Sequence, residues 1–276
     1  MATYAEYLHN SVTPPATLWH YTTHPGLLGI IQGKSLWATK IHYLNDSSEF
    51  SYALGLVGKI LEKRIGVEQS DRGRLEAFRN SIPNIETINV CVASFRELPD
   101  DLSQWRAYSG PAGGHAIGFN SEYLRATARA EGFFLTRCRY VEAEQRQLIN
   151  HLIDWCLSEQ HTDPDIALKC WYFPARLARL APVLKDSSFE GEREWRLISQ
   201  PRMVTEMCFR EGKSMLVPYT KFELKGDTNS YLTSITVGPS PNLSLSKASI
   251  VMFLRHHDVQ EPEKKVIESK IPYRNW

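Results

Sequence analysis

A strand, a short helix and a second strand follow one another near the start of the chain, and this unit constrains the fold more than any other stretch. The apolar run that ends at His20-Tyr21-Thr22 predicts a strand, and Ser35–Thr39 predicts the next. Leu27 and Ile31 fit one buried side of a helix between them. We expect the polar residues around this unit to converge on one edge: His20, Tyr21, Asn45, Asp46 and Glu49.

The remaining pattern predicts an α+β fold. Helical spacing runs from about residue 47 to 78, and a short helix is expected around Trp105. Continuous apolar or β-branched runs predict strands at 88–95 and 115–119. We expect one domain over residues 1–276, with a mainly helical insertion at about 120–185 and one short strand near Cys138–Val141. Further strands are expected near residues 195–198, 215–217, 234–239 and 265–269.

Composition bounds the class of protein. The 276 residues are 42% hydrophobic, which is enough for a packed core. A formal net charge of +1 gives no overall attraction to nucleic acid or anionic lipid. Five scattered cysteines indicate neither a disulfide framework nor a cysteine-built zinc site. Without a leader-like N-terminus or a membrane-spanning run, we expect a cytoplasmic protein that does not bind membranes.

A second group of polar residues lies at Glu192, Glu194 and Arg196. On a strand the period of two would place all three on one face. Paired carboxylates can bind a ribose hydroxyl and stabilise positive charge on an anomeric carbon. The alternative is a solvated face in which Arg196 bridges its neighbours. With two carboxylates about two residues apart on one strand face, Glu194→Gln should relieve their repulsion and leave stability unchanged or slightly raised.

Each of the other polar candidates has a structural alternative. Asp46 followed by Glu49 fits a capping box at a helix start. His20 can be a satisfied core histidine, and Trp105 and Tyr108 can pack a core rather than cover a ligand.

We expect no metal site. The adjacent residues His256-His257-Asp258 point in different directions on a strand or a helix. The loop Gly110–Gly114 lacks the Lys-Ser/Thr ending of a phosphate loop, so a turn is the better interpretation.

The order of these motifs resembles the bacterial family called domain of unknown function 2971, over nearly the whole chain. The chain departs from the family's usual residues at Ser47-Ser48 and at Gln104. The motifs are His20-Tyr21-Thr22, Leu44-Asn45-Asp46 with Glu49, Cys91–Phe95, Trp105 with Tyr108, Gly114 with Gly118-Phe119, Glu192 with Glu194-Trp195-Arg196, Val237-Gly238-Pro239 and Ile271–Arg274.

The opening unit is also similar to DarT-like and RNA 2′-phosphotransferase-like members of the ADP-ribosyltransferase superfamily. In that superfamily a basic residue on the first strand, a hydroxyl residue on a middle strand and a late glutamate hold and activate NAD. His20, Ser94 and Glu194 follow that order, which implies a split mixed sheet and these three as catalytic residues around one cleft. Glu192 with Glu194 resembles the superfamily's Glu-x-Glu element, whose second glutamate is catalytic.

The resemblance implies roles for the other candidates and a substrate. NAD is expected as the substrate, without a metal, and Glu49, Glu192 and Arg196 are expected at the acceptor or behind the contacting residues. The acceptor is DNA, RNA or protein, and small enzymes of this kind are often toxins or anti-phage effectors with an antitoxin or defence-system partner. The residues expected to bind the cofactor are His20, Tyr21, Thr22, Asn45, Asp46, Trp105 and Tyr108.

Two other functions stay open. One is a module that binds a nucleotide or partner without turning it over, in which the carboxylates are structural. The other is an RNA 2′-phosphotransferase-like enzyme, which would need more basic residues than Arg96, Arg106 and Arg196 supply.

Overall fold

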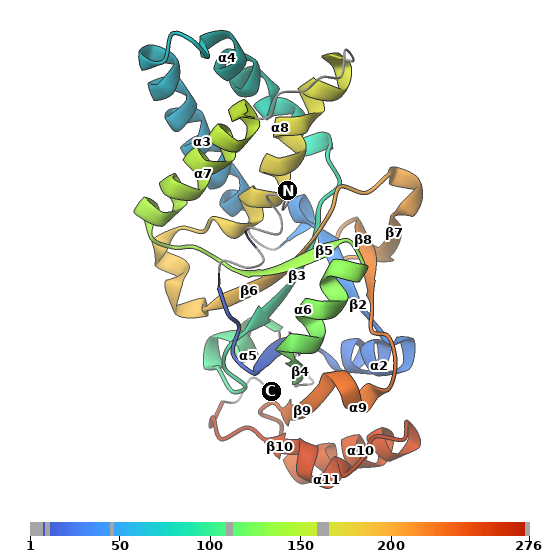
Figure 1. Cartoon of the computed structure of the whole chain (residues 1–276). Helices are drawn as coiled ribbons and strands as arrows, with labels where there is room; N and C mark the ends of the chain where they lie inside the picture. Colours follow the sequence, from blue (N-terminus) through green and yellow to red (C-terminus); the bar gives the residue numbers. More distant parts are fainter. Residues whose placement is uncertain (1–7, 9–11, 45–46, 109–112, 159–165, 274–276) are drawn as a thin grey trace. The chain divides into compact units, whose positions relative to one another are not determined.

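A computed structural model describes residues 8, 12–44, 47–108, 113–158 and 166–273 (Figure 1). Contacts divide the chain into two compact units, each built from separate stretches of sequence. Unit 1 consists of Met1–Val12, Ala38–Ala93 and Thr136–Thr220. Unit 2 consists of Thr13–Trp37, Ser94–Leu135 and Lys221–Trp276. Four of the five boundaries fall inside strands, namely β2 (Ser35–Lys40), β3 (Cys91–Arg96), β5 (Phe133–Arg137) and β8 (Leu216–Glu223), and the fifth lies between Val12 and Thr13.

Unit 1 contains a layer of four long helices, visible together in Figure 1. They are α3 (Ser47–Val67), α4 (Arg72–Ser81), α7 (Glu142–Ser158) and α8 (Ile166–Leu180). Helix α3 packs on α4 and α7, and α8 packs on the same two helices. Fully buried residues such as Leu61, Leu75, Ile149 and Leu177 form the core between them. The helical spacing predicted for residues 47–78 is confirmed as α3 and α4.

Short 3-10 helices connect these elements and lead to the strands of unit 1. Strand β6 (Glu194–Ser199) is buried along its whole length and pairs with β3 and β5. Strands β2 and β3 pair antiparallel, with Thr39 opposite Val92, and β7 (Cys208–Glu211) forms an antiparallel hairpin with β8. The 3-10 helices are η1 (Ile41–Tyr43), η2 (Ile82–Thr87), η3 (Ala181–Val183), η4 (Ser187–Glu192) and η5 (Val204–Glu206).

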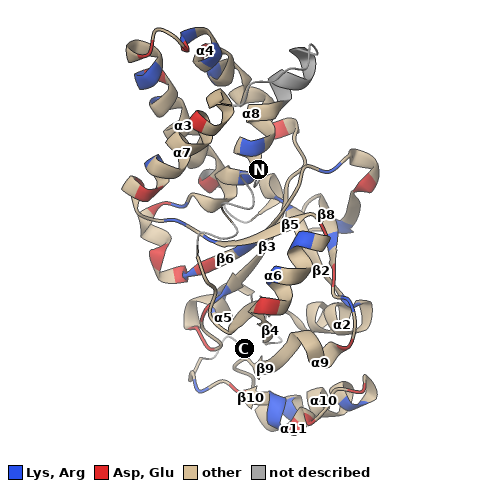
Figure 2. Cartoon of the chain, in the orientation of Figure 1, with Lys and Arg blue, Asp and Glu red and all other residues tan. Residues whose placement is uncertain are grey.

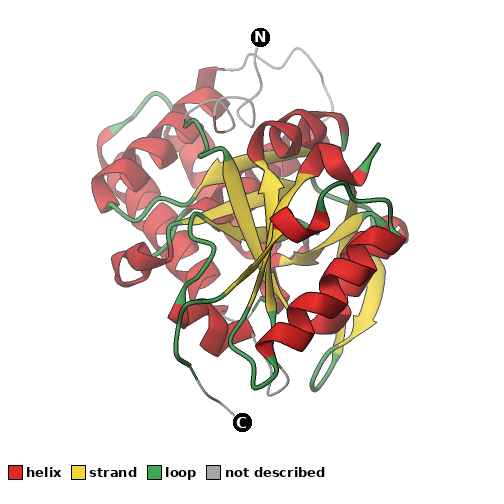
Figure 3. Ribbon diagram, turned by 90° about the horizontal axis from the view of Figure 1, so that it is seen from below, coloured by secondary structure: helices red, strands yellow, loops and turns green. Residues whose placement is uncertain are grey.

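Unit 2 is built on β1 (Thr17–Thr22), which pairs antiparallel with β4 (His115–Asn120). Strand β4 pairs antiparallel with β9 (Leu232–Val237), and β9 pairs parallel with β10 (Val266–Glu268). Figure 3 shows helices beside these strands. The helices are α2 (His24–Gly33), α5 (Leu102–Tyr108), α6 (Ser121–Ala130), α9 (Thr228–Tyr231), α10 (Leu243–His256) and α11 (Pro262–Lys265).

The α+β class is confirmed, since the strands pair mostly antiparallel and helices flank them. The strand expected at Cys138–Val141 is wrong in position, because the apolar run Phe133–Leu135 forms β5 instead. Arg139 makes an isolated bridge to Leu184. The sequence pattern also missed β7, whose residues alternate in exposure without a continuous apolar run. The single domain and the ADP-ribosyltransferase-like sheet stay predictions.

Charged residues of both signs occur together on some helices and are absent from others, such as α2. In Figure 2 both α3 and α7 carry acidic and basic residues. Among the helices of the described residues, none is both long enough and apolar enough to cross a membrane.

Candidate functional site

A buried, strongly charged region of unit 1 begins where η4 meets β6. Glu192 is the last residue of η4, and Glu194 is the first residue of β6. Arg193 between them adopts a left-handed conformation, with φ 44° and ψ 48°. The expectation that Glu192 shares a strand face with Glu194 and Arg196 is therefore wrong for Glu192, because the left-handed residue separates it from the strand.

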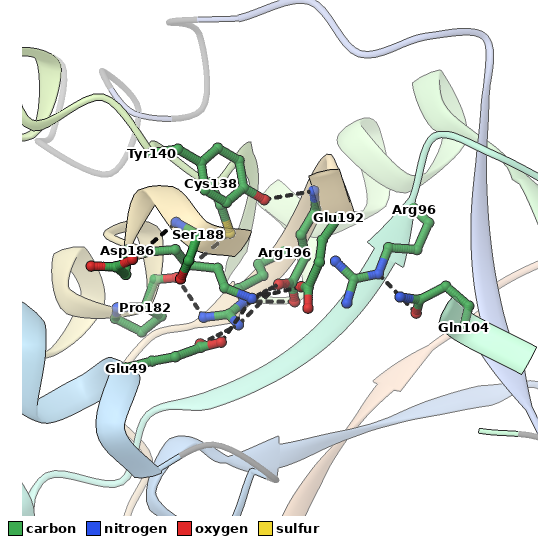
Figure 4. Close-up of polar contacts among 12 residues, drawn as sticks. Glu49, Arg96, Gln104, Cys138, Tyr140, Pro182, Asp186, Ser188, Glu192 and Arg196 are labelled. Carbon is green, nitrogen blue, oxygen red and sulfur yellow. Dashed lines mark hydrogen bonds and ion pairs between the residues drawn. The ribbon is translucent and has the colours of Figure 1, made fainter. Parts of the chain in front are cut away.

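Five charged side chains meet at this point, and we call them the Glu–Lys–Arg cluster (Figure 4). They come from α3, from the segment between η3 and η4, from the end of η4 and from β6. The cluster holds three carboxylates and two cations, so its formal charge is −1. Its members are Glu49, Lys185, Glu192, Glu194 and Arg196.

Lys185 contacts all three carboxylates of the cluster. Its Nζ lies 2.7 Å from Glu49 Oε1, 2.7 Å from Glu192 Oε2 and 2.8 Å from Glu194 Oε2. The three protons of an ammonium group match three acceptors. Nζ also lies 4.9 Å from the centre of the Phe189 ring. Lys185 thus links carboxylates that would otherwise repel one another.

Arg196 is the second cation of the cluster. Its Nε donates to Glu194 Oε1 at 2.8 Å, and its Nη2 donates to Glu194 Oε2 at 3.1 Å and to Glu49 Oε2 at 2.7 Å. Its Nη1 donates to the Pro182 carbonyl at 2.8 Å. The two contacts to Glu194 form the bidentate pair that a guanidinium makes with a carboxylate.

Exposure differs sharply among the carboxylates. The side chains of Lys185 and Glu194 are each 2% exposed, and that of Arg196 is 4% exposed. Glu49 is 10% exposed, whereas Glu192 is 27% exposed. The cluster is therefore closed around Glu194 and reaches solvent mainly at Glu192.

The carboxylates keep both cations charged. Burial by itself would lower the pKa of Lys185, but the charges of Glu194 and Glu49 outweigh this and raise the pKa. Burial likewise opposes the charge of Arg196, and Glu194 and Glu49 again leave its pKa raised. Burial raises the pKa of the neighbouring Cys138 to about 12, so this thiol stays protonated.

A buried amide fixes the backbone beside Lys185. Gln145 Nε2 donates to the carbonyl of Lys185 at 2.6 Å and to that of Arg139 at 2.7 Å. Its Oε1 accepts from Tyr52 Oη at 2.8 Å. Tyr140 Oη accepts from the Glu194 amide at 2.9 Å and fixes the start of β6. The Gln145 amide is fully buried. Both of its N–H groups donate and its oxygen accepts one hydrogen bond, so three of its four hydrogen-bonding positions are used.

His20 and Ser94 lie together in unit 2. His20 Nδ1 is 3.0 Å from the Ser94 carbonyl oxygen, so Nδ1 carries the proton and Nε2 presents its lone pair. Burial lowers the pKa of His20, and the Ser94 hydrogen bond opposes that shift without reversing it. His20 is therefore a neutral acceptor at neutral pH. The prediction that both residues line one cleft with Glu194 stays a prediction.

The aromatic residues expected to bind the cofactor occupy a packed group in unit 2. Trp105 is fully buried and its Nε1 donates to Asp100 Oδ1 at 2.7 Å. Tyr21 contacts it edge-on with 4.7 Å between ring centres, and Tyr21 Oη donates to the Leu98 carbonyl. Tyr108 is partly buried against the same group. Their role in binding a ligand stays a prediction.

The remaining predicted residues are less informative. Thr22 lies against the first turn of α2, since a Cβ at Gly26 would be 1.9 Å from Thr22 Oγ1. Asn45 and Asp46, with the predicted cap of α3, lie outside the described residues. Within the described ranges no group of three or more His, Cys, Asp or Glu residues could hold a metal ion.

Sequence reasoning missed Lys185, Gln145 and Tyr140. Lys185 carried one usable signal, because it directly follows the buried apolar run Ala181–Leu184. A lysine is almost never fully buried unless it is paired, so this position predicts acidic partners. Gln145 and Tyr140 carried no such signal.

The fold and the site define an α+β protein with a buried, net negative ion cluster. The family model described as Protein of unknown function (DUF2971) matches residues 104–197. This match confirms the resemblance to that family over a stretch that includes four members of the cluster, Lys185, Glu192, Glu194 and Arg196. No curated protein and no solved structure matches the chain.

Proposed function

We propose that the protein cleaves NAD and transfers its ADP-ribose group to a macromolecule. The observation that carries this proposal is the Glu–Lys–Arg cluster, which has a formal charge of −1 and one partly exposed carboxylate. The nicotinamide ring of NAD is positively charged, and positive charge develops on the ribose as the glycosidic bond breaks. Fixed carboxylates in a poorly solvated position stabilise such charge more strongly than water does.

The proposed reaction needs no resident cofactor. The bond between the ribose C1 and the nicotinamide nitrogen breaks, and its electron pair leaves with nicotinamide. A nucleophile of the acceptor then bonds to C1 and gives up its proton to water. The cluster stabilises the cationic centre between these two events.

His20 supplies a second line of support. Its fixed Nδ1–H leaves Nε2 as a hydrogen-bond acceptor, which suits a ribose hydroxyl donor. The order of His20, Ser94 and Glu194 along the chain is the one expected of an ADP-ribosyltransferase. The proposed acceptor is DNA, RNA or protein, and the proposed role is that of a toxin or anti-phage effector, which is common among small enzymes that consume NAD.

One observation favours a second candidate, a module that binds a nucleotide or partner without turnover. Glu194 is 2% exposed, its Oε2 accepts from Lys185 and Arg196, and its Oε1 accepts from Arg196. A carboxylate held in this way can serve structure alone.

Nicotinamide release separates the two candidates. The protein is incubated with NAD labelled in the adenylate group, and with single-stranded DNA, RNA or a protein extract as acceptor. The proposal predicts nicotinamide release together with transfer of label to one acceptor. Saturable NAD binding without release would favour the binding module. Neither release nor binding would overturn both.

A further inference from the structure

The structure assigns the contact with NAD to Glu192, and we propose that Lys185 is the residue that positions it. This inference rests on the proposed function and differs from the resemblance, which makes the second glutamate, Glu194, the catalytic one. The contacted group is the ribose on the nicotinamide side, whose hydroxyls donate to a carboxylate and whose C1 becomes cationic.

Exposure separates the two glutamates. Glu192 has 27% of its side chain exposed, and Glu194 has 2%. A residue that touches substrate needs at least one oxygen that solvent or ligand can reach. Glu194 would have to break its bonds to Lys185 and Arg196 before it met a ligand, whereas Glu192 lies at the solvent side of the same ion pairs.

The backbone holds Glu192 in this place. The left-handed conformation of Arg193 turns the chain between η4 and β6 and takes Glu192 out of the register of the strand. Lys185 then fixes the Glu192 carboxylate through a 2.7 Å contact between Nζ and Oε2. The carbonyl of Lys185 is itself held by Gln145, so the anchor is tied to α7.

The roles divide accordingly. Glu192 contacts the ligand and is the catalytic carboxylate. Lys185 acts through Glu192, and Glu194 with Arg196 supplies the buried charge that holds Lys185. Glu49 closes the cluster from α3 by contacts to both cations.

The test compares kcat and KM for nicotinamide release in Glu192→Gln and in Glu190→Gln. Glu190 is an exposed glutamate of the same 3-10 helix and controls for the loss of one charge. We expect Glu192→Gln to lower kcat on the order of 100-fold with a smaller change in KM, since the contact strengthens in the transition state. Melting temperature should stay close to that of the wild type, as should both constants in Glu190→Gln.

A double-mutant cycle tests the positioning role. Lys185→Met should lower kcat, and Lys185→Arg should restore part of it. The variant Lys185→Met with Glu192→Gln removes one charge of each sign and should be no slower than Glu192→Gln alone, because Lys185 acts through Glu192. The double variant keeps the net charge of the cluster, so it can be measured even if Lys185→Met alone does not fold.

The outcomes separate this inference from the proposed function. A Glu192→Gln variant with more than half of the wild-type kcat would overturn the inference while the function stands. Additive losses in the cycle would overturn the positioning role. No nicotinamide release by the wild type would overturn the proposed function, and the inference with it.

Discussion

At the scale of residues, the ion pairs of Glu194 reverse an expectation about stability. From sequence, removing its charge should relieve repulsion from Glu192. In the structure Lys185 and Arg196 both donate to Glu194 in a buried position. Loss of one member of a buried ion pair leaves the partner charge uncompensated.

We therefore predict that Glu194→Gln lowers the free energy of unfolding on the order of 3 kcal/mol. Urea denaturation of the variant and of Glu190→Gln, the exposed control, measures the difference. Equal stability of Glu194→Gln and wild type would show that the ion pairs contribute nothing net.

Two glutamines of α7, the buried Gln145 and the exposed Gln147, allow a controlled prediction about stability. Gln145→Leu leaves the carbonyls of Lys185 and Arg139 and the Tyr52 hydroxyl without the amide. We expect a loss of about 1–3 kcal/mol in the free energy of unfolding. Gln147→Leu, at an exposed position of the same helix, should change it by less than about 0.5 kcal/mol. Similar effects at the two positions would contradict the anchoring role of Gln145.

His115 gives the fold a pH dependence. Burial, with a smaller effect of His24 at 2.6 Å, lowers the pKa of His115 from 6.5 to about 3. Between about pH 3 and pH 6.5, His115 is protonated in the unfolded chain but not in the folded chain. The free energy of unfolding therefore rises with pH over this range. The contribution is fully present above about pH 6.5 and falls by about 1.4 kcal/mol per unit as pH drops toward 3.

The measurement is the free energy of unfolding of His115→Gln between pH 7 and pH 5, a window above the ordinary titration of carboxylates. The variant should lose less stability over this window than wild type or than His256→Gln, an exposed control. Parallel curves for all three proteins would rule out a role for His115.

At the scale of elements, the junction between η4 and β6 determines how the cluster is arranged. The sequence pattern located β6 correctly but extended its alternation back to Glu192. The alternation of residues along a strand does not reveal a left-handed backbone conformation at an arginine, a residue type that rarely adopts it. The two paired carboxylates of the sequence pattern, Glu192 and Glu194, both contact Lys185, but Glu192 lies in η4 and not on the strand.

The same junction yields a prediction about strain. An arginine at φ 44° is disfavoured relative to glycine, so Arg193→Gly should leave the free energy of unfolding unchanged or raise it by up to about 1 kcal/mol. Glu190→Gly, inside η4, should lower it by about 0.5–1 kcal/mol. Thermal melting of the two variants compares them directly, and a larger loss at Arg193 than at Glu190 would contradict this account.

At the scale of the whole molecule, hydrophobic patterning predicted the α+β class and most strands and helices. It failed where an element lacks a continuous apolar run, as in β7. Hydrophobic patterning does not predict long-range polar contacts. Lys185 and Glu49, for example, are 136 positions apart in sequence, and no local pattern encodes their ion pair. The proposed function rests on this nonlocal part of the structure.

The most direct test of the central claim is a crystal structure of the full chain with a non-hydrolysable NAD analogue. The account predicts that the ribose on the nicotinamide side lies within hydrogen-bond distance of a carboxylate of the Glu–Lys–Arg cluster, with Glu192 as the contacting residue. An analogue bound away from the cluster, or no binding at saturating concentration, would contradict the account.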